Sequence, residues 1–118
     1  MDLEVIGLSV DCADAAELAM FWSEVLGRPI GEGASAEYAS IPATGQGKSG
    51  PRLTFHRVPE PKTVKNRLHL DLITNSFPDE SARVLGLGAT KVRDVEAGQA
   101  RWTTFADPEG NEFDLVAR

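Results

Sequence analysis

The chain has 118 residues, of which 42% are hydrophobic, enough for one domain with a buried core but too few for two independent domains. Its 12 Lys and Arg residues against 18 Asp and Glu give a formal net charge of -6, which argues against a nucleic-acid or membrane-surface partner. There is no signal-like start, no apolar run that could span a bilayer, and only one cysteine, Cys12. We therefore expect a cytoplasmic protein without an internal disulfide.

The first half is predicted to run in the order strand, helix, three strands. Residues 3–11 alternate between apolar and polar side chains, as a half-buried strand does. Asp14, with Glu17 three residues later, predicts the start of a helix, and Gly27 predicts its end. A short extended piece follows at residues 28–30. Two strands are predicted at residues 37–41 and 52–58, with a glycine-rich turn at residues 45–50 between them.

The second half repeats this order at an offset of about 62 residues. A strand is predicted at residues 68–73 and a helix that begins near 78–80 and ends at Gly88. Three extended segments complete the repeat: 89–92, 101–105 and 112–116. The sequence thus predicts a single α+β domain, residues 1–118, with two βαβββ modules (1–58 and 68–118) and a connector (59–67).

Strand periodicity predicts which side chains share a face. In the second module Leu68, Leu70 and Leu72 should pack on the helices, which leaves His69 and Asp71 on the opposite face. Applied to every strand, this rule predicts one curved mixed sheet around a polar cup, with the helices outside. The residues expected to line that cup are Gly7, Ser9, Thr54, His56, His69, Asp71 and Asp114.

Two stretches carry a family resemblance, DAAELAMFWSEVLG at residues 14–27 and DPEGNEFDLV at residues 107–116. They resemble the signature segments of the glyoxalase, bleomycin-resistance and extradiol-dioxygenase superfamily, also called vicinal oxygen chelate proteins. The KNRLHLDL run at residues 65–72 is similar to glyoxalase-like proteins of actinobacteria. The resemblance covers nearly the whole chain and implies a small-molecule ligand, a homodimer and, in many members, a divalent metal.

The metal-ligand positions of the superfamily correspond here to Gly7, Thr54, His69 and Asp114. Only His69 and Asp114 are of a type that binds metal, because glycine has no side chain and threonine offers a neutral hydroxyl. The resemblance therefore implies a metal site held by His69 and Asp114 that lacks at least one ligand. His56, on the same predicted face as Thr54, is a candidate for the missing one.

Two functions remain open at this stage. In the first, His69 and Asp114 are the catalytic residues of a lyase or isomerase, either as metal ligands or as proton-transfer groups. In the second, the protein sequesters a drug or metabolite without catalysis, as bleomycin-resistance proteins do. Ligand contacts are expected from Ser9, Tyr38, Thr54, His56, Asp71 and Trp102, although burial in the core would explain the two aromatic residues equally well.

Overall fold

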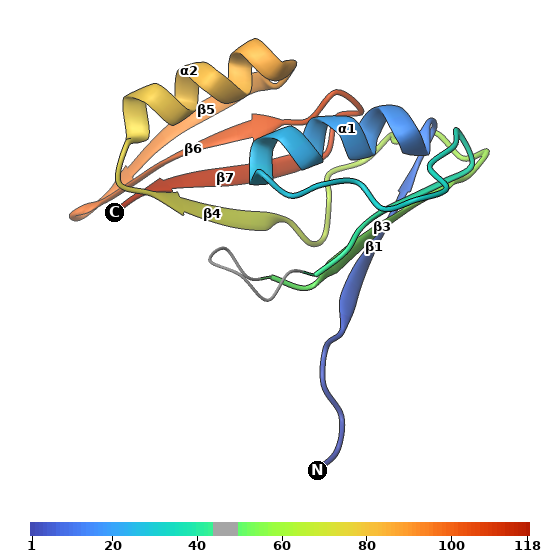
Figure 1. Ribbon diagram of the computed structural model, residues 1–118. Helices are drawn as coiled ribbons and strands as arrows, with labels where there is room; N and C mark the ends of the chain where they lie inside the picture. Colours follow the sequence, from blue (N-terminus) through green and yellow to red (C-terminus); the bar gives the residue numbers. More distant parts are fainter. Residues whose placement is uncertain (44–49) are drawn as a thin grey trace. The chain divides into compact units, whose positions relative to one another are not determined.

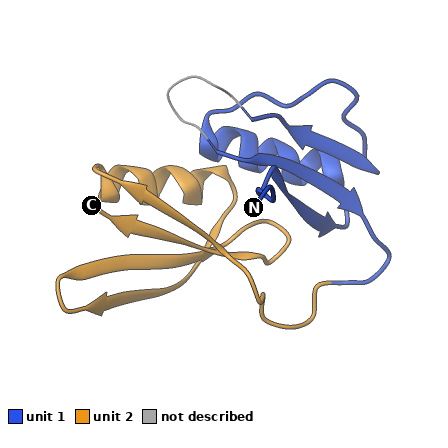
Figure 2. Cartoon of the chain, turned by 90° about the horizontal axis from the view of Figure 1, so that it is seen from below, with its two compact units in different colours: residues 1–61 blue, residues 62–118 orange. Residues whose placement is uncertain are grey.

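The computed structural model describes residues 1–43 and 50–118. The chain divides into two compact units, Met1–Pro61 and Lys62–Arg118, coloured separately in Figure 2. In the part of the chain described, each unit has its own helix and its own mixed sheet (Figure 1). Apart from Gly50, the predicted glycine-rich turn lies outside the described residues.

Unit 1 is a three-stranded sheet with one helix. Its elements are β1 (Gly7–Cys12), α1 (Ala15–Leu26), β2 (Tyr38–Ile41) and β3 (Arg52–Arg57). The central strand, β3, pairs in parallel with β1 and antiparallel with β2. Leu53 and Phe55 of β3 are buried together with apolar side chains of α1, and Thr54 between them is buried as well, so burial does not alternate along the middle of this strand.

The ends of α1 follow from local chemistry. The Asp14 carboxylate accepts a hydrogen bond from the Glu17 backbone N–H at 3.1 Å, which satisfies one of the amides left free at a helix start. Gly27 ends the helix with φ of 65°, a left-handed conformation that glycine adopts without steric cost. Both predicted boundaries of this helix are confirmed.

Two predicted segments of unit 1 differ from the structure. Residues 28–30 are not in a strand, since Pro29 has no N–H for a ladder and the Arg28 side chain points to loop carbonyls. Residues 1–6 also lie outside β1, and Val5, expected as an apolar strand member, is 78% exposed. The ladder between β1 and β3 begins only at the pair Gly7 and Arg52.

Unit 2 keeps the full order strand, helix, three strands. Its elements are β4 (Leu70–Thr74), α2 (Phe77–Leu87), β5 (Thr90–Ala97), β6 (Ala100–Ala106) and β7 (Glu112–Ala117). The strands lie in the order β4-β7-β6-β5, with β4 parallel to β7 and the other neighbours antiparallel. The helix α2 lies against one face of this sheet (Figure 1).

The core of unit 2 lies on the α2 side of the sheet. Phe105 and Phe113 are paired across β6 and β7, and their rings stack with centroids 5.7 Å apart. Val84 of α2 and Leu115 are buried with them. The prediction that Leu68 packs there is wrong, because Leu68 precedes β4 and is 82% exposed.

The architecture is therefore the predicted α+β class, with one helix and one mixed sheet in each repeat. No helix in residues 1–43 and 50–118 is long and apolar enough to cross a membrane.

Gly7 provides a test of the β1–β3 pairing. A Cβ at this position would lie 2.9 Å from the Arg52 carbonyl oxygen, a backbone atom that moves only if the ladder moves. We expect Gly7→Ala to lower the free energy of unfolding by about 1–3 kcal/mol. Gly86→Ala is the control, because Gly86 is inside α2 with nothing near the added Cβ, and it should raise stability by up to about 1 kcal/mol. Urea unfolding curves that gave both variants the same sign of change would contradict this explanation.

Candidate functional site

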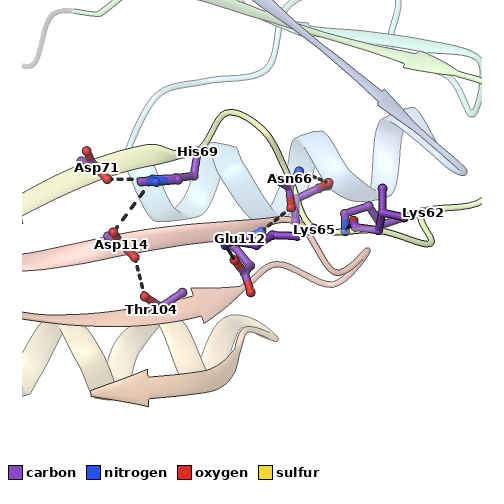
Figure 3. Close-up of polar contacts among 10 residues, drawn as sticks. Lys62, Lys65, Asn66, His69, Asp71, Thr104, Glu112 and Asp114 are labelled. Atoms are coloured by element: carbon purple, nitrogen blue, oxygen red, sulfur yellow. Dashed lines mark hydrogen bonds and ion pairs between the residues drawn. The ribbon is translucent and has the colours of Figure 1, made fainter. Parts of the chain in front are cut away.

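The candidate site is a row of polar side chains across three strands of unit 2. Asp71 of β4 is paired with Asp114 of β7, and Asp114 is paired with Thr104 of β6. Residues directly opposite one another in a sheet project from the same face, so these three side chains lie together on the face away from Phe113 and α2. The Thr104 hydroxyl donates to Asp114 Oδ1 at 2.6 Å, which orients the carboxylate (Figure 3).

His69 lies at one end of this row. Its Nδ1 is 2.9 Å from Asp71 Oδ1 and 3.9 Å from Asp114 Oδ2, as Figure 3 shows. The side chains of His69 and Asp71 are 42% and 63% exposed, whereas that of Asp114 is 18% exposed. The site is therefore an accessible imidazole between two carboxylates, of which one is held firmly within the sheet.

A side-chain clip positions the segment that carries His69. His69 precedes β4 and has no ladder pairing of its own, but Asn66 accepts a hydrogen bond from the Glu112 backbone N–H at 3.0 Å. Asn66 also donates to Asn111 Oδ1 at 3.2 Å, and Lys65 pairs with the Glu112 carboxylate (Figure 3). Hydrogen bonding to the Lys65 ammonium lowers the pKa of Glu112 below its ordinary value. No sequence pattern predicted the clip, since residues 59–67 were expected to be only a connector.

The DPEGN turn sets where β7 begins. Asp107 is buried, and its Oδ1 accepts hydrogen bonds from the backbone N–H groups of Glu109 and Asn111 at 2.9 and 3.0 Å. Asn111 also donates its side-chain amide to both Asp107 oxygens. The turn that carries the family resemblance thus fixes the strand on which Asp114 lies.

Unit 1 has a row of polar side chains at the equivalent strand positions, but these side chains are uncharged. Ser9, Thr54 and Ser40 are paired across β1, β3 and β2, in the same pattern as Asp71, Asp114 and Thr104 in unit 2. The Ser9 and Thr54 hydroxyls lie 2.8 Å apart, so the predicted proximity of these two residues is found. Hydroxyls stand where unit 2 has its two carboxylates, and the third position is a hydroxyl in both units.

The predicted aromatic contacts occupy equivalent positions in the two units. Tyr38 is paired with His56, two residues after Thr54, and Trp102 is paired with Val116, two residues after Asp114. The Tyr38 and His56 rings meet edge to face with centroids 5.2 Å apart. Tyr38 is 40% exposed and Trp102 is half-buried, so neither belongs to the deepest core.

An apolar row lies beside the polar row in unit 2. Its members lie two residues from the polar row along each strand, so all of them project from the face that carries Asp114. They are Ile73, Val116, Trp102 and Val95. This face therefore offers charged groups next to hydrophobic surface.

The expected cup residues are divided between the units. Within unit 2 the structure brings His69, Asp71 and Asp114 together, and within unit 1 it brings Ser9 and Thr54 together. A separate open pocket of about 490 Å³ lies on the α2 side of β5 and β6, away from the polar row. It is lined by Phe77, Asp94, Glu96, Arg101 and Thr103, none of which the sequence singled out.

Solved structures with this fold come from several bacteria. A glyoxalase/bleomycin resistance protein/dioxygenase family enzyme from Burkholderia phytofirmans PsJN is 16% identical, with a TM-score of 0.77 and 98% of each chain covered. A glyoxalase-related enzyme from Fulvimarina pelagi is 14% identical, with a TM-score of 0.71, covering 100% of this chain and 89% of that one. A glyoxalase/bleomycin resistance protein/dioxygenase from Nocardioides is 14% identical, with a TM-score of 0.73 and coverage of 99% and 84%.

These structures share the fold, while no curated protein matches the sequence significantly. The model of one family, described as the glyoxalase-like domain, matches residues 7–116, which include both helices and, except for the last residue of β7, both sheets. The chain therefore belongs to the glyoxalase-like domain family.

Proposed function

We propose that this protein binds a small organic molecule on the polar face of the unit 2 sheet and that His69 moves a proton to or from it, in a lyase or isomerase reaction. The observation that carries the proposal is the 2.9 Å contact between His69 Nδ1 and Asp71 Oδ1, with Asp114 Oδ2 at 3.9 Å. Carboxylates that accept from Nδ1–H favour the tautomer in which Nε2 keeps a lone pair. Nε2 is then the atom that accepts a proton.

The reaction class follows from an imidazole base, His69, that lies beside two carboxylates. When Nε2 takes a proton from a carbon beside a substrate carbonyl, the C–H electron pair moves toward the carbonyl oxygen and an enolate forms. When the carbon that loses the proton also carries a hydroxyl, return of the proton to the former carbonyl carbon, with the hydroxyl proton passing to the former carbonyl oxygen, gives the isomer. When the next carbon carries a leaving group, that group departs with its bonding electron pair as the carbonyl re-forms, which gives the lyase product. Arg93, opposite Thr104 in the sheet register, adds positive charge on the face where the enolate oxygen would develop negative charge.

The apolar row supports an organic ligand. Trp102 and Val116 lie two residues from Thr104 and Asp114 along their strands and on the same face. Binding sites for small molecules combine hydrophobic surface with a few oriented polar groups, and an indole ring stacks well on a flat ligand. We propose that the ligand places its carbonyl near His69 and its carbon skeleton on this row.

A second candidate function is sequestration without chemistry. It is favoured by the equivalent placement of Tyr38 and Trp102, which gives each unit one accessible aromatic ring beside its polar row. A flat aromatic or cationic compound would bind to such rings by stacking. Under either function we place the protein in the reducing cytoplasm, in keeping with the single buried Cys12, and expect a homodimer, as the family resemblance implies.

One experiment separates the two functions. A thermal-shift screen of carbonyl, aromatic and cationic compounds selects ligands, and each ligand is then incubated with the protein in D2O and followed by NMR for deuterium uptake at carbon. For a proton-transfer enzyme we expect catalysed exchange, and His69→Gln should slow it by about 100-fold or more while the thermal shift remains. His56→Gln is the matched control, because His56 is the second of the two histidines and belongs to unit 1.

The opposite pattern supports sequestration. A ligand that stabilises the protein without deuterium exchange, and whose effect is unchanged by His69→Gln but lost in Trp102→Ala, would identify a binder. Exchange that continues at the parent rate in His69→Gln would remove His69 from the proposed mechanism.

A further inference from the structure

We infer that the open pocket on the α2 side of β5 and β6 is a second binding site of unit 2, for a small zwitterion of the α-amino-acid type. The pocket has a volume of about 490 Å³, which is within the range of small-molecule sites. It lies on the opposite face of the sheet from the polar row that includes Asp114. The inference therefore goes beyond the proposed function and does not depend on it.

The sheet register places the polar lining of the pocket on one face. Across β5 and β6, Asp94 is paired with Thr103 and Glu96 with Arg101. Thr103 is paired in turn with Leu115, which is buried in the core beneath α2, so all of these side chains project toward the helix side. The hairpin of β5 and β6 extends beyond the first turn of α2 (Figure 1). The helix therefore leaves Glu96 and Arg101 exposed at the open end of this face.

Glu96 and Arg101 have opposite charges at directly opposite positions, yet the Arg101 guanidinium lies over another group. Its central carbon is 4.4 Å from the centroid of the Phe77 ring, a cation–π contact with the first residue of α2. In residues 1–43 and 50–118, no hydrogen bond or ion pair engages the Glu96 carboxylate or joins it to Arg101. A guanidinium held flat on a ring keeps N–H groups in its plane that can donate to a carboxylate.

The third charged residue of the lining, Asp94, already has its partners. Its Oδ1 accepts the Thr103 hydroxyl at 2.7 Å, and its Oδ2 pairs with the Lys91 ammonium. These hydrogen bonds, that to Lys91 above all, lower the pKa of Asp94 below its ordinary value. The negative charge of Asp94 is thus balanced by Lys91, and one carboxylate and one guanidinium remain to recognise a ligand.

This balance of charges selects the class of ligand. A molecule with one ammonium group and one carboxylate can pair with both Glu96 and Arg101, whereas a simple cation or anion pairs with one of them and is repelled by the other. A short apolar side chain of the ligand would lie against the Phe77 ring. Because both charged side chains are exposed to water, we expect affinities in the millimolar range.

The test is an NMR titration of the isotope-labelled full-length chain with L-leucine and with two analogues that each lack one charge. Isoamylamine lacks the carboxylate, and isocaproate lacks the ammonium group. With L-leucine we expect saturable shifts of the backbone amide signals of Phe77, Glu96 and Arg101. Each analogue should bind at least about fivefold more weakly, because it forms only one of the two ion pairs.

Four variants locate the site on one face of the sheet. Glu96→Gln and Arg101→Gln should each weaken L-leucine binding by at least about fivefold. The matched controls Asp71→Asn and Arg93→Gln remove the same charges from the other face of the same sheet and should leave the affinity unchanged. Arg101→Lys guards against a merely structural effect, because it keeps the charge and should retain more affinity than Arg101→Gln.

Three results would overturn the inference. They are the absence of saturable shifts with L-leucine, equal affinity for all three probes, and loss of binding in Asp71→Asn or Arg93→Gln with shifts around Asp114. The last would place the amino acid on the polar face instead. None of these results bears on proton transfer by His69, which the deuterium-exchange experiment tests separately.

Discussion

Replacing Phe113 by alanine is expected to lower the free energy of unfolding by about 3–5 kcal/mol, the usual cost of removing a buried phenylalanine. Phe113 is 1% exposed and stacks on Phe105, which is equally buried, in the core beneath α2. The deletion would remove the apolar surface of one ring and leave a cavity against the other. Urea unfolding monitored by circular dichroism gives the change.

Leu85→Ala is the control for this prediction. Leu85 is an apolar residue of the same unit, but it lies on the exposed side of α2, so its loss should cost less than about 1 kcal/mol. Similar losses in the two variants would mean that the Phe105 and Phe113 stack is not the centre of the unit 2 core.

Replacing Arg28 by methionine is expected to cost about 3–5 kcal/mol. The Arg28 side chain is buried, and its Nη2 lies 3.3, 2.8 and 2.9 Å from the carbonyl oxygens of Ile41, Pro42 and Pro51. Methionine keeps much of the volume but donates no hydrogen bond, so carbonyl groups would lose a charged partner at about 1–3 kcal/mol each. Thermal and urea unfolding should agree on the size of the loss.

Arg57→Met tests whether burial is the cause. Arg57 belongs to the same unit and its Nη1 lies 3.3 Å from Glu37 Oε1, but both side chains are exposed. Exposed ion pairs contribute about 0–1 kcal/mol, so this variant should unfold almost as the parent does. A comparable loss in both variants would show that the carbonyl contacts of Arg28 are not what stabilises unit 1.

The features predicted correctly depend on short stretches of sequence. The ends of α1 follow from Asp14 and Gly27, whose effects reach only a few residues. The common face of Asp71 and Asp114 follows from strand periodicity, which needs no knowledge of the partner strand. The repeated order of elements likewise follows from local patterns, and the sheet registers place Tyr38 and Trp102 at equivalent positions of the two units.

The features that were missed depend on where distant segments meet. Leu68 was placed in a strand because its spacing fits, but β4 begins at Leu70, which pairs with Phe113 near the start of β7. The hydrogen bond between Asn66 and Glu112 joins residues 46 positions apart, and a lone asparagine in a polar connector gives no sign of it. Asp71 was expected to contact a ligand, but its proximity to Asp114 and His69 could be seen only in the folded structure.

The polar rows of the two units occupy equivalent positions in their sheets but differ in chemistry. Ser9, Thr54 and Ser40 are neutral, so a change among them alters the shape and hydrogen bonding of that face without altering any ionisation. A change at Asp71 or Asp114 alters charge beside an imidazole. Shape and charge can therefore vary independently within one short chain, the first through the row of unit 1 and the second through the row of unit 2.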